Sequence, residues 1–287
     1  MLAEQGSARR KLALVSWDGP GQPAILGKIT VDATEALAYL DDLRARTGVR
    51  ATLTHLVAKA VLEAIAGVPR LNTRLVLGRF LPNPDPSVSV LVALSGGADL
   101  ARFKIDGGTT RSVEEIALAC ERRVSALRSG ADRAHQAGSG VIKVLPAWLL
   151  GPVIRALGYL AGAMGIPVPP AGLEPMPFGS CIISNVGVFG VEEAFIPLMH
   201  WSHVPVYVCV GAVRDLPAAV DGEVCVRPQM VVTATIDHRY VDGAQAARFA
   251  GIIKAVLDDP WRWDAARPGR ADARAAATRR LPAPAGR

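Results

Sequence analysis

The segment Thr233–Ala246, TATIDHRYVDGAQA, begins as an apolar-rich strand and continues as a helix. Side chains alternate between the two faces of a strand, so His238 is predicted to share a face with the apolar residues Ala234 and Ile236. We therefore expect a partly desolvated imidazole at the end of a buried strand. An imidazole that is neutral near pH 7 is well suited to act as a general base.

Three further residues are candidates to fix the position of this histidine. Asp242 follows His238 by four residues and is predicted to orient the imidazole or to hold the turn through a salt bridge. Arg239 is a candidate partner for either Asp242 or Asp237. Gly243 is expected to allow a backbone conformation that other residues resist. An H-x-x-x-D-G pattern by itself is more often a turn than a catalytic site, so its meaning depends on the rest of the chain.

The other elements follow from hydrophobic periodicity and from helix and turn signals. A capping box of Ser112 and Glu115 precedes an amphipathic helix, and Asp221-Gly222 predicts a hairpin turn. Because helices alternate with mostly antiparallel strands, we expect an α/β (α+β) domain with a mixed, mainly antiparallel sheet and flanking helices. The expected helices are 32–46, 53–66, 113–127 and 244–257, and the expected strands are 88–94, 180–185, 204–213, 223–228 and 230–237.

Length and charge indicate the organisation of the chain. The 287 residues, half of them hydrophobic, are enough for one large domain or two small ones. Residues 1–11 and 265–287 carry +2 and +5 of the net charge of +6, which leaves the rest of the chain near −1. A folded basic groove for nucleic acid is therefore not expected. We expect a flexible tail over residues 1–11, one folded domain over 12–264 and a disordered Arg/Ala/Pro-rich tail over 265–287.

The cysteines and the apolar segments bear on the compartment. The four cysteines form no CxxC pair, and residues 1–11 lack the apolar core of a signal peptide, so a reduced, cytoplasmic protein is expected. Residues 144–166 are strongly apolar but contain Pro146, Pro152 and Arg155. We expect a buried or subunit-interface helix there, with membrane contact as the alternative.

The remaining histidines have simpler interpretations. His55 recurs with Lys59 and Glu63 at intervals of four residues, which predicts a polar, solvent-exposed stripe on a helix. His200 and His203 lie in the segment MHWSHVP and are expected at the surface or at an interface. They lack Cys or acidic residues at metal-site spacing, so no metal is expected.

A set of motifs in fixed order resembles the catalytic domain of the dihydrolipoamide acyltransferase components of 2-oxo acid dehydrogenase complexes. The resemblance runs from about residue 12 to residue 263 and is strongest in the last hundred of these residues. Each motif alone is unspecific, whereas the combination is specific. The motifs are Ile183-Ser184-Asn185-Val186-Gly187, Phe195-Ile196-Pro197, Asp221-Gly222 with Arg227-Pro228, Asp237-His238-Arg239 with Asp242-Gly243, and the segment PRLNTRL at Pro69–Leu75.

The resemblance implies a fold, an activity and a site. It implies the chloramphenicol acetyltransferase-like two-layer fold, usually trimeric, with an acyltransferase catalytic domain over residues 12–264. The reaction it implies is transfer of an acyl group between coenzyme A and a dihydrolipoyl thiol. His238 would take the proton from the attacking thiol, and Ser184 would stabilise the oxyanion across the subunit interface, with Asp242 as a third catalytic residue. Gly243, Arg239 and Asn185 would support the turns.

Departures from the family leave the acceptor and the role open. Only about eleven residues precede the domain, so we expect no lipoyl domain in the chain; the acceptor is then a lipoyl group supplied in trans by a lipoyl-domain protein, or another thiol, amine or alcohol. Met199–Pro205 is longer than the connection usual in the family. Related antibiotic acetyltransferases and condensation domains usually carry a His-His pair, whereas Asp237 precedes His238 here. The alternative from another class is a non-catalytic trimeric scaffold or a membrane-associated assembly protein.

Overall fold

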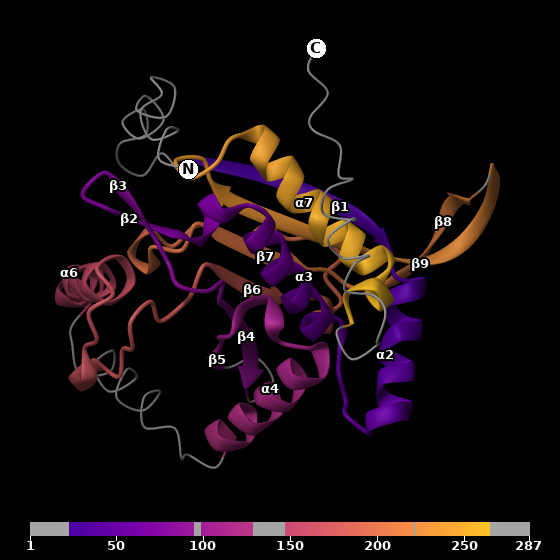
Figure 1. Ribbon diagram of the computed structural model, residues 1–287, viewed down its shortest axis with the longest axis horizontal. Helices are drawn as coiled ribbons and strands as arrows, with labels where there is room; N and C mark the ends of the chain where they lie inside the picture. Colours follow the sequence, from indigo (N-terminus) through magenta and orange to yellow (C-terminus); the bar gives the residue numbers. More distant parts are fainter. Residues whose placement is uncertain (1–22, 95–98, 129–146, 221, 265–287) are drawn as a thin grey trace.

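A computed structural model describes residues 23–94, 99–128, 147–220 and 222–264 of the chain. The two predicted tails, residues 1–11 and 265–287, lie outside the described residues. Helices cover one face of a central sheet, and a long hairpin projects from the body (Figure 1).

The central sheet has seven strands in the order β1-β9-β7-β6-β4-β5, with β8 paired to β9. Strand β6 runs parallel to both of its neighbours, and all other pairs are antiparallel. The expected mixed, mainly antiparallel sheet is confirmed. The strands are β1 (Ala24–Asp32), β4 (Val88–Leu94), β5 (Asp99–Ile105), β6 (Cys181–Asn185), β7 (Val206–Val210), β8 (Arg214–Val220) and β9 (Glu223–Asp237), and a separate hairpin joins β2 (Thr73–Val76) to β3 (Arg79–Pro82).

Four of the described helices, α2, α3, α4 and α7, lie close to the expected ranges. Ser112 and Glu115 form the predicted capping box, in which each side chain bonds to the other residue's backbone N–H. The first helix begins at Thr34 rather than at 32, since the Asp32 carboxylate accepts the Thr34 N–H. The helices are α2 (Thr34–Thr47), α3 (Leu53–Gly67), α4 (Val113–Arg128), α6 (Ala147–Gly158) and α7 (Gly243–Asp258).

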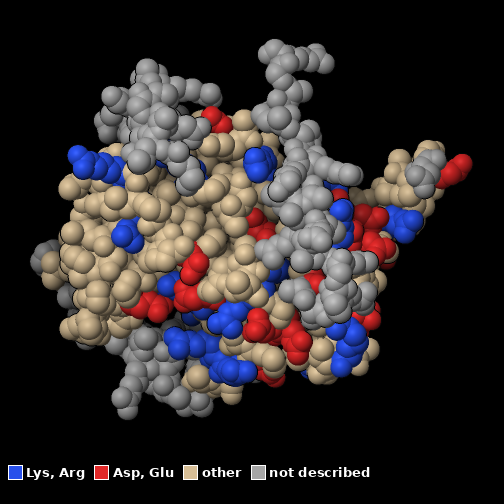
Figure 2. Space-filling model, in the orientation of Figure 1, with Lys and Arg blue, Asp and Glu red and all other residues tan. Residues whose placement is uncertain are grey.

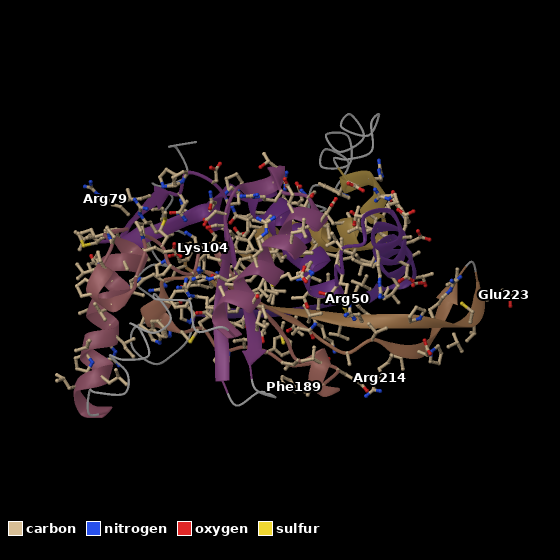
Figure 3. The ribbon with its side chains drawn as sticks, turned by 90° about the horizontal axis from the view of Figure 1, so that it is seen from below. Arg50, Arg79, Lys104, Phe189, Arg214 and Glu223 are labelled. Atoms are coloured by element: carbon tan, nitrogen blue, oxygen red, sulfur yellow. The ribbon has the colours of Figure 1, made fainter. Side chains whose placement is uncertain are left out.

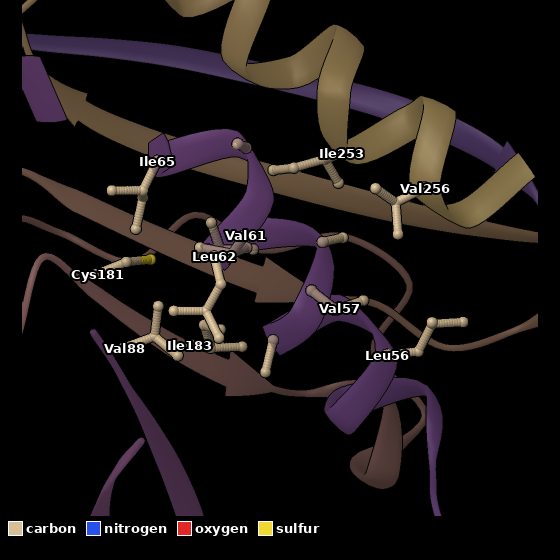
Figure 4. Packing of buried hydrophobic residues seen from close by; sticks show 14 of the residues in the cluster. Leu56, Val57, Val61, Leu62, Ile65, Val88, Cys181, Ile183, Ile253 and Val256 are labelled. Carbon is tan, nitrogen blue, oxygen red and sulfur yellow. The ribbon is translucent and has the colours of Figure 1, made fainter. Parts of the chain in front are cut away.

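The main core lies between the sheet and helices α3 and α7 (Figure 4). Leu62 and Ile65 of α3 face Cys181 and Ile183 of β6, while Ile253 of α7 packs from the other side. Fully burying one such aliphatic side chain contributes about 1.5–3 kcal/mol. This packing fixes α3 along β6.

The polar stripe of α3 does not face solvent, which corrects the prediction. Lys59 and Glu63 have side chains only 2% and 5% exposed and form an ion pair of 2.9 Å. Lys59 Nζ also donates to the Thr109 carbonyl oxygen over 2.7 Å. The segment that covers this stripe is the short helix Gly108–Thr110, about fifty residues away in the sequence. A buried charge pair is tolerated when it is hydrogen-bonded in this way.

The β8–β9 hairpin differs from the expected strands in two respects. The strand expected over 204–213 is only Val206–Val210, and a separate strand, β8, forms the first arm of the hairpin. The two strands expected after the turn are one continuous strand, because β9 pairs first with β8 and then with β1 and β7. The arm reaches away from the body, with Glu223 near its tip and Arg214 near its base (Figure 3).

The apolar segment 144–166 forms α6 and a following π-helical turn, Tyr159–Ala163, with residues 144–146 outside the described part of the chain. Pro152 lies inside α6, and Arg155 is exposed. Gly158 and Ala161–Ala163 are buried, whereas most of the described part of α6 is partly or fully exposed. A helix buried within one copy of the chain is therefore not found, and the subunit-interface alternative stays a prediction. Among the described residues, no helix is both long enough and apolar enough to cross a membrane.

Candidate functional site

His238 lies directly after the last residue of β9, in the turn that follows the strand. Ile236 and Val232 belong to the main core, whereas Thr233 and Asp237 are buried on the other face. The backbone around the histidine is held on both sides. Asp237 N–H donates to the Pro205 carbonyl oxygen over 2.9 Å, and His238 N–H donates to that of Pro23. His238 is half-buried, which agrees with a partly desolvated imidazole.

The turn is clamped by an ion pair between its own residues. Arg239 Nη2 lies 2.6 Å from Asp237 Oδ2, and Arg239 Nε lies 3.0 Å from Oδ1. The Arg239 backbone N–H also donates to Oδ1 over 2.9 Å. These bonds raise the pKa of Arg239. Of the two acids considered as partners of Arg239, the structure selects Asp237.

Asp242 holds the turn by capping a helix. Its Oδ1 accepts the Gln245 backbone N–H over 3.1 Å, and Gln245 Oε1 accepts the Asp242 N–H over 3.3 Å. This capping box starts α7 immediately after the turn. Gly243 is the first residue of α7 and does not have a positive φ, so the predicted conformational role of this glycine is wrong. A Cβ at Gly243 would meet nothing within 4 Å.

Ser184 lies near the carboxyl end of β6, next to Asn185. Asn185 Nδ2 donates to Thr54 Oγ1 of α3 over 2.8 Å, and Asn185 Oδ1 accepts the Val188 N–H over 3.3 Å. Asn185 therefore ties the strand end to both the helix and the following loop. Ser184 and Asn185 line an open cavity of about 840 Å³, which is within the size range of small-molecule sites.

The loop after Ser184 is held by close backbone packing. A Cβ at Gly211 would lie 1.9 Å from the Glu192 carbonyl oxygen, and a Cβ at Gly187 would lie 2.5 Å from that of Gly211. Only glycine fits at this approach. Two backbone bonds join the same segments, from Val186 N–H to the Val210 carbonyl and from Ala212 N–H to the Val191 carbonyl. The loop is therefore fixed beside Ser184.

His55 is not on an exposed stripe, which corrects the prediction. It is partly buried and lines the same cavity as Ser184. Its Nδ1 accepts the Thr52 backbone N–H over 3.1 Å at the start of α3. Burial lowers the pKa of His55 to about 4. Thr52 followed three residues later by His55 resembles a capping box, and this signal could have indicated that the imidazole points back to the helix start.

A second cavity of about 360 Å³ lies beside the turn and is lined by His200, His203 and Arg239. His200 is exposed as expected, whereas His203 is half-buried against the Tyr159 ring, at 5.7 Å between ring centroids. Burial lowers the pKa of His203, and the charge of Arg239 adds to this effect. Within the described ranges, no group of three or more His, Cys, Asp or Glu side chains could hold a metal ion.

The sheet register separates Ser184 from His238. Ser184 pairs with Cys209 of β7, which pairs with Thr233 of β9, and His238 lies five residues beyond Thr233. Five residues of strand cover about 16 Å, and two strand spacings add about 10 Å across, so the two residues are about 19 Å apart. One copy of the chain therefore does not bring them to a common reaction centre.

Charged side chains of both signs are interspersed on the face of the molecule in Figure 2. Among the described residues on that face, no extended patch of a single sign is visible. Few charged side chains lie on the part of this face above α6.

Residues 172–264 match the family model described as 2-oxoacid dehydrogenases acyltransferase (catalytic domain). The chain is 26% identical over 216 residues to the dihydrolipoyllysine-residue acetyltransferase component of the acetoin cleaving system of Bacillus subtilis, covering 75% of this chain and 43% of that protein. It is 42% identical over 90 residues to the mitochondrial dihydrolipoyllysine-residue succinyltransferase component of the 2-oxoglutarate dehydrogenase complex of Mus musculus, covering 31% of this chain and 19% of that protein. The chain thus spans less than half the length of these relatives.

Solved structures share the fold. One is the Azotobacter vinelandii dihydrolipoamide acetyltransferase, studied for the roles of a serine, a histidine and an asparagine in its catalytic mechanism. It matches with a TM-score of 0.60 at 18% identity, over 91% of this chain and 90% of that one. A chloramphenicol acetyltransferase matches with a TM-score of 0.50 at 12% identity, over 88% of this chain and 97% of that one. At these identities the matches establish the fold, and the expected chloramphenicol acetyltransferase-like fold is confirmed.

Proposed function

Because the chain has the chloramphenicol acetyltransferase-like fold and its carboxyl-terminal part resembles the catalytic domain of the 2-oxoacid dehydrogenase acyltransferases, we propose that it is a coenzyme A-dependent acyltransferase. It moves an acyl group between coenzyme A and a second thiol, with a dihydrolipoyl group as the first candidate. The observation that carries the proposal is the placement of the two motif residues, Ser184 beside a cavity and His238 at a clamped strand end.

His238 is the general base in this reaction. It removes the proton from the acceptor thiol, and the thiolate attacks the carbonyl carbon of the acyl-coenzyme A thioester. The tetrahedral intermediate then collapses, the bond from carbon to the coenzyme A sulfur breaks, and the departing sulfur receives the proton from His238. A free thiol has a pKa of about 8.5, so a neighbouring base needs to shift only a modest equilibrium.

Ser184 donates a hydrogen bond to the oxyanion of that intermediate. One such donor typically contributes a factor of about 10²–10³ to turnover. The Azotobacter relative supports these assignments, since its studied histidine and asparagine are four positions apart, as are His238 and Asp242. The aspartate in this chain acts as a positioning residue, because its carboxylate caps α7 and holds the turn that presents His238.

The site is shared between subunits. Since Ser184 and His238 of one copy are about 19 Å apart, a reaction that uses both must take them from two copies. In a closed ring with head-to-tail contacts, each interface can bring Ser184 of one copy to His238 of the next. A trimer is the smallest ring in which every interface is head-to-tail. We therefore propose a homotrimer, alone or within a larger assembly.

The proposal is tested by thiol release from acetyl-coenzyme A in the presence of free dihydrolipoamide. We expect turnover by the wild-type protein, a loss of about 10²–10⁴-fold in His238→Ala and of about 10²–10³-fold in Ser184→Ala. Absence of turnover in the folded wild-type protein with acetyl, propionyl and succinyl thioesters would favour a non-catalytic scaffold instead.

A further inference from the structure

The hydrogen bond at the start of α3 determines which nitrogen of His55 carries the proton. The Thr52 backbone N–H can only donate, and it points at His55 Nδ1 over 3.1 Å. Nδ1 is therefore the acceptor, and in the neutral imidazole the hydrogen lies on Nε2. The helix start thus holds the ring with one nitrogen turned back to the backbone and the other left as an N–H donor.

The imidazole stays neutral under ordinary conditions. Burial lowers the pKa of His55 to about 4, so the ring carries no positive charge near pH 7. Its position in the first turn of α3 acts in the same direction, since a helix N-terminus disfavours a cation. His55 therefore offers a single neutral donor with a defined direction.

His55 and Ser184 line the same cavity, and one hydrogen bond links their neighbours. Asn185 Nδ2 donates to Thr54 Oγ1 over 2.8 Å, so each of the two residues is one position from this contact. Among the residues that the structure describes, His55 Nε2 has no hydrogen-bond partner. The wall around it mixes apolar residues, such as Val90, Val92 and Phe189, with polar and charged ones that include Arg50 and Glu121.

We propose that His55 is a substrate-binding residue, whose Nε2–H donates a hydrogen bond to a carbonyl oxygen of the acyl thioester bound in the Ser184 cavity. This inference rests on the proposed acyltransferase function and adds a contact to it. The donor is held at a fixed place in the cavity wall by the helix cap, because the other ring nitrogen accepts the Thr52 N–H. One directed N–H donor then contributes to orientation as well as affinity.

Three substitutions separate the donor from the helix cap. Gln and Glu are the usual residues at the third position of a capping box, so His55→Gln and His55→Glu both keep an acceptor for the Thr52 N–H. Gln also keeps an N–H donor, whereas ionised Glu has none. His55→Leu removes the cap and the donor without adding charge, and it controls for the charge of His55→Glu.

The measurement is kcat and KM for acyl-coenzyme A thioesters, together with the melting temperature of each variant. We expect His55→Gln to retain most of kcat/KM, and His55→Glu and His55→Leu to lose about ten-fold, the effect of one hydrogen bond to a substrate. His55→Leu alone should melt at a lower temperature. If all three variants keep kcat/KM within about two-fold, the donor role is wrong and His55 is only a cap.

The result is distinguishable from failure of the proposed function. If the wild-type protein turns over no acyl thioester, the acyltransferase proposal fails first. Calorimetric titration with acetyl-coenzyme A then decides the role of His55. Weaker binding of acetyl-coenzyme A by His55→Glu and His55→Leu than by His55→Gln supports the donor role of His55. Equal affinities, or no binding by the wild-type protein, overturn it.

Discussion

Mixing two inactive variants tests the placement of Ser184 and His238 most directly. The perturbation is to combine Ser184→Ala and His238→Ala proteins in equal amounts, dissociate them reversibly and let them reassemble. Each single variant lacks one of the two groups at every site. Because the sheet register puts Ser184 and His238 of one chain about 19 Å apart, intact sites must draw on two chains.

The magnitude follows from the head-to-tail arrangement. A site is intact when the chain that supplies His238 comes from the Ser184→Ala protein and its neighbour, which supplies Ser184, comes from the His238→Ala protein. With random assembly of equal amounts, each condition holds for about half of the subunits, so about one quarter of the sites are restored. The background of each variant alone should be about 1% or less, given the typical effect of losing an oxyanion donor.

The assay is thiol release from acetyl-coenzyme A before and after mixing, with native mass spectrometry to count mixed assemblies. Recovery near a quarter of the wild-type rate supports the shared site. Mixed assemblies that form but show no recovery would refute the reasoning, and so would an active wild-type protein that sediments as a monomer.

Three further predictions concern the residues that hold the site. Asp242→Ala should lower the free energy of unfolding by about 1 kcal/mol through loss of the α7 cap, whereas Asp242→Asn keeps the cap; chemical denaturation compares them, and equal losses would contradict the capping role. Lys59→Met should lower the free energy of unfolding by about 3–5 kcal/mol, measured in urea, because it leaves Glu63 buried without this cation. Adding Glu63→Leu should recover part of this loss, and a double variant less stable than Lys59→Met would contradict the ion-pair explanation. Gly211→Ala should destabilise by about 1–3 kcal/mol and lower turnover, since its Cβ would overlap the Glu192 carbonyl oxygen; an unchanged melting curve would contradict the close approach.

Several features of the site were predictable because their causes are local in the chain. The alternation along β9 needs only neighbouring residues, and it puts Val232 and Ile236 in the main core with Thr233 and Asp237 on the other face. The capping box of Ser112 and Glu115 follows from three-residue spacing and is present as predicted. The sequence left two roles open for Asp242, orienting the histidine or holding the turn. The structure shows that Asp242 holds the turn by capping α7.

Other features were not predictable because their partners are distant in sequence. Lys59 and Glu63 have the spacing of a solvated stripe, and only the packing of Gly108–Thr110 over α3 shows that they are buried. His55 was assigned to the same exposed stripe for the same reason. Strand β8 has weak apolar alternation, and its pairing with β9 is what defines it.

The sequence by itself determined most of the helices, the motif that ends β9 and the choice of Ser184 and His238 as candidate residues, since these depend on side-chain type and short spacing. Tertiary structure decided where those residues lie. Ser184 and His238 stand at different ends of one sheet because β6 and β9 run antiparallel with β7 between them, and strand direction and order are properties of long-range pairing. Packing of α3 against the sheet, with the Asn185–Thr54 hydrogen bond between residues 131 positions apart, puts His55 and Ser184 in the wall of one cavity.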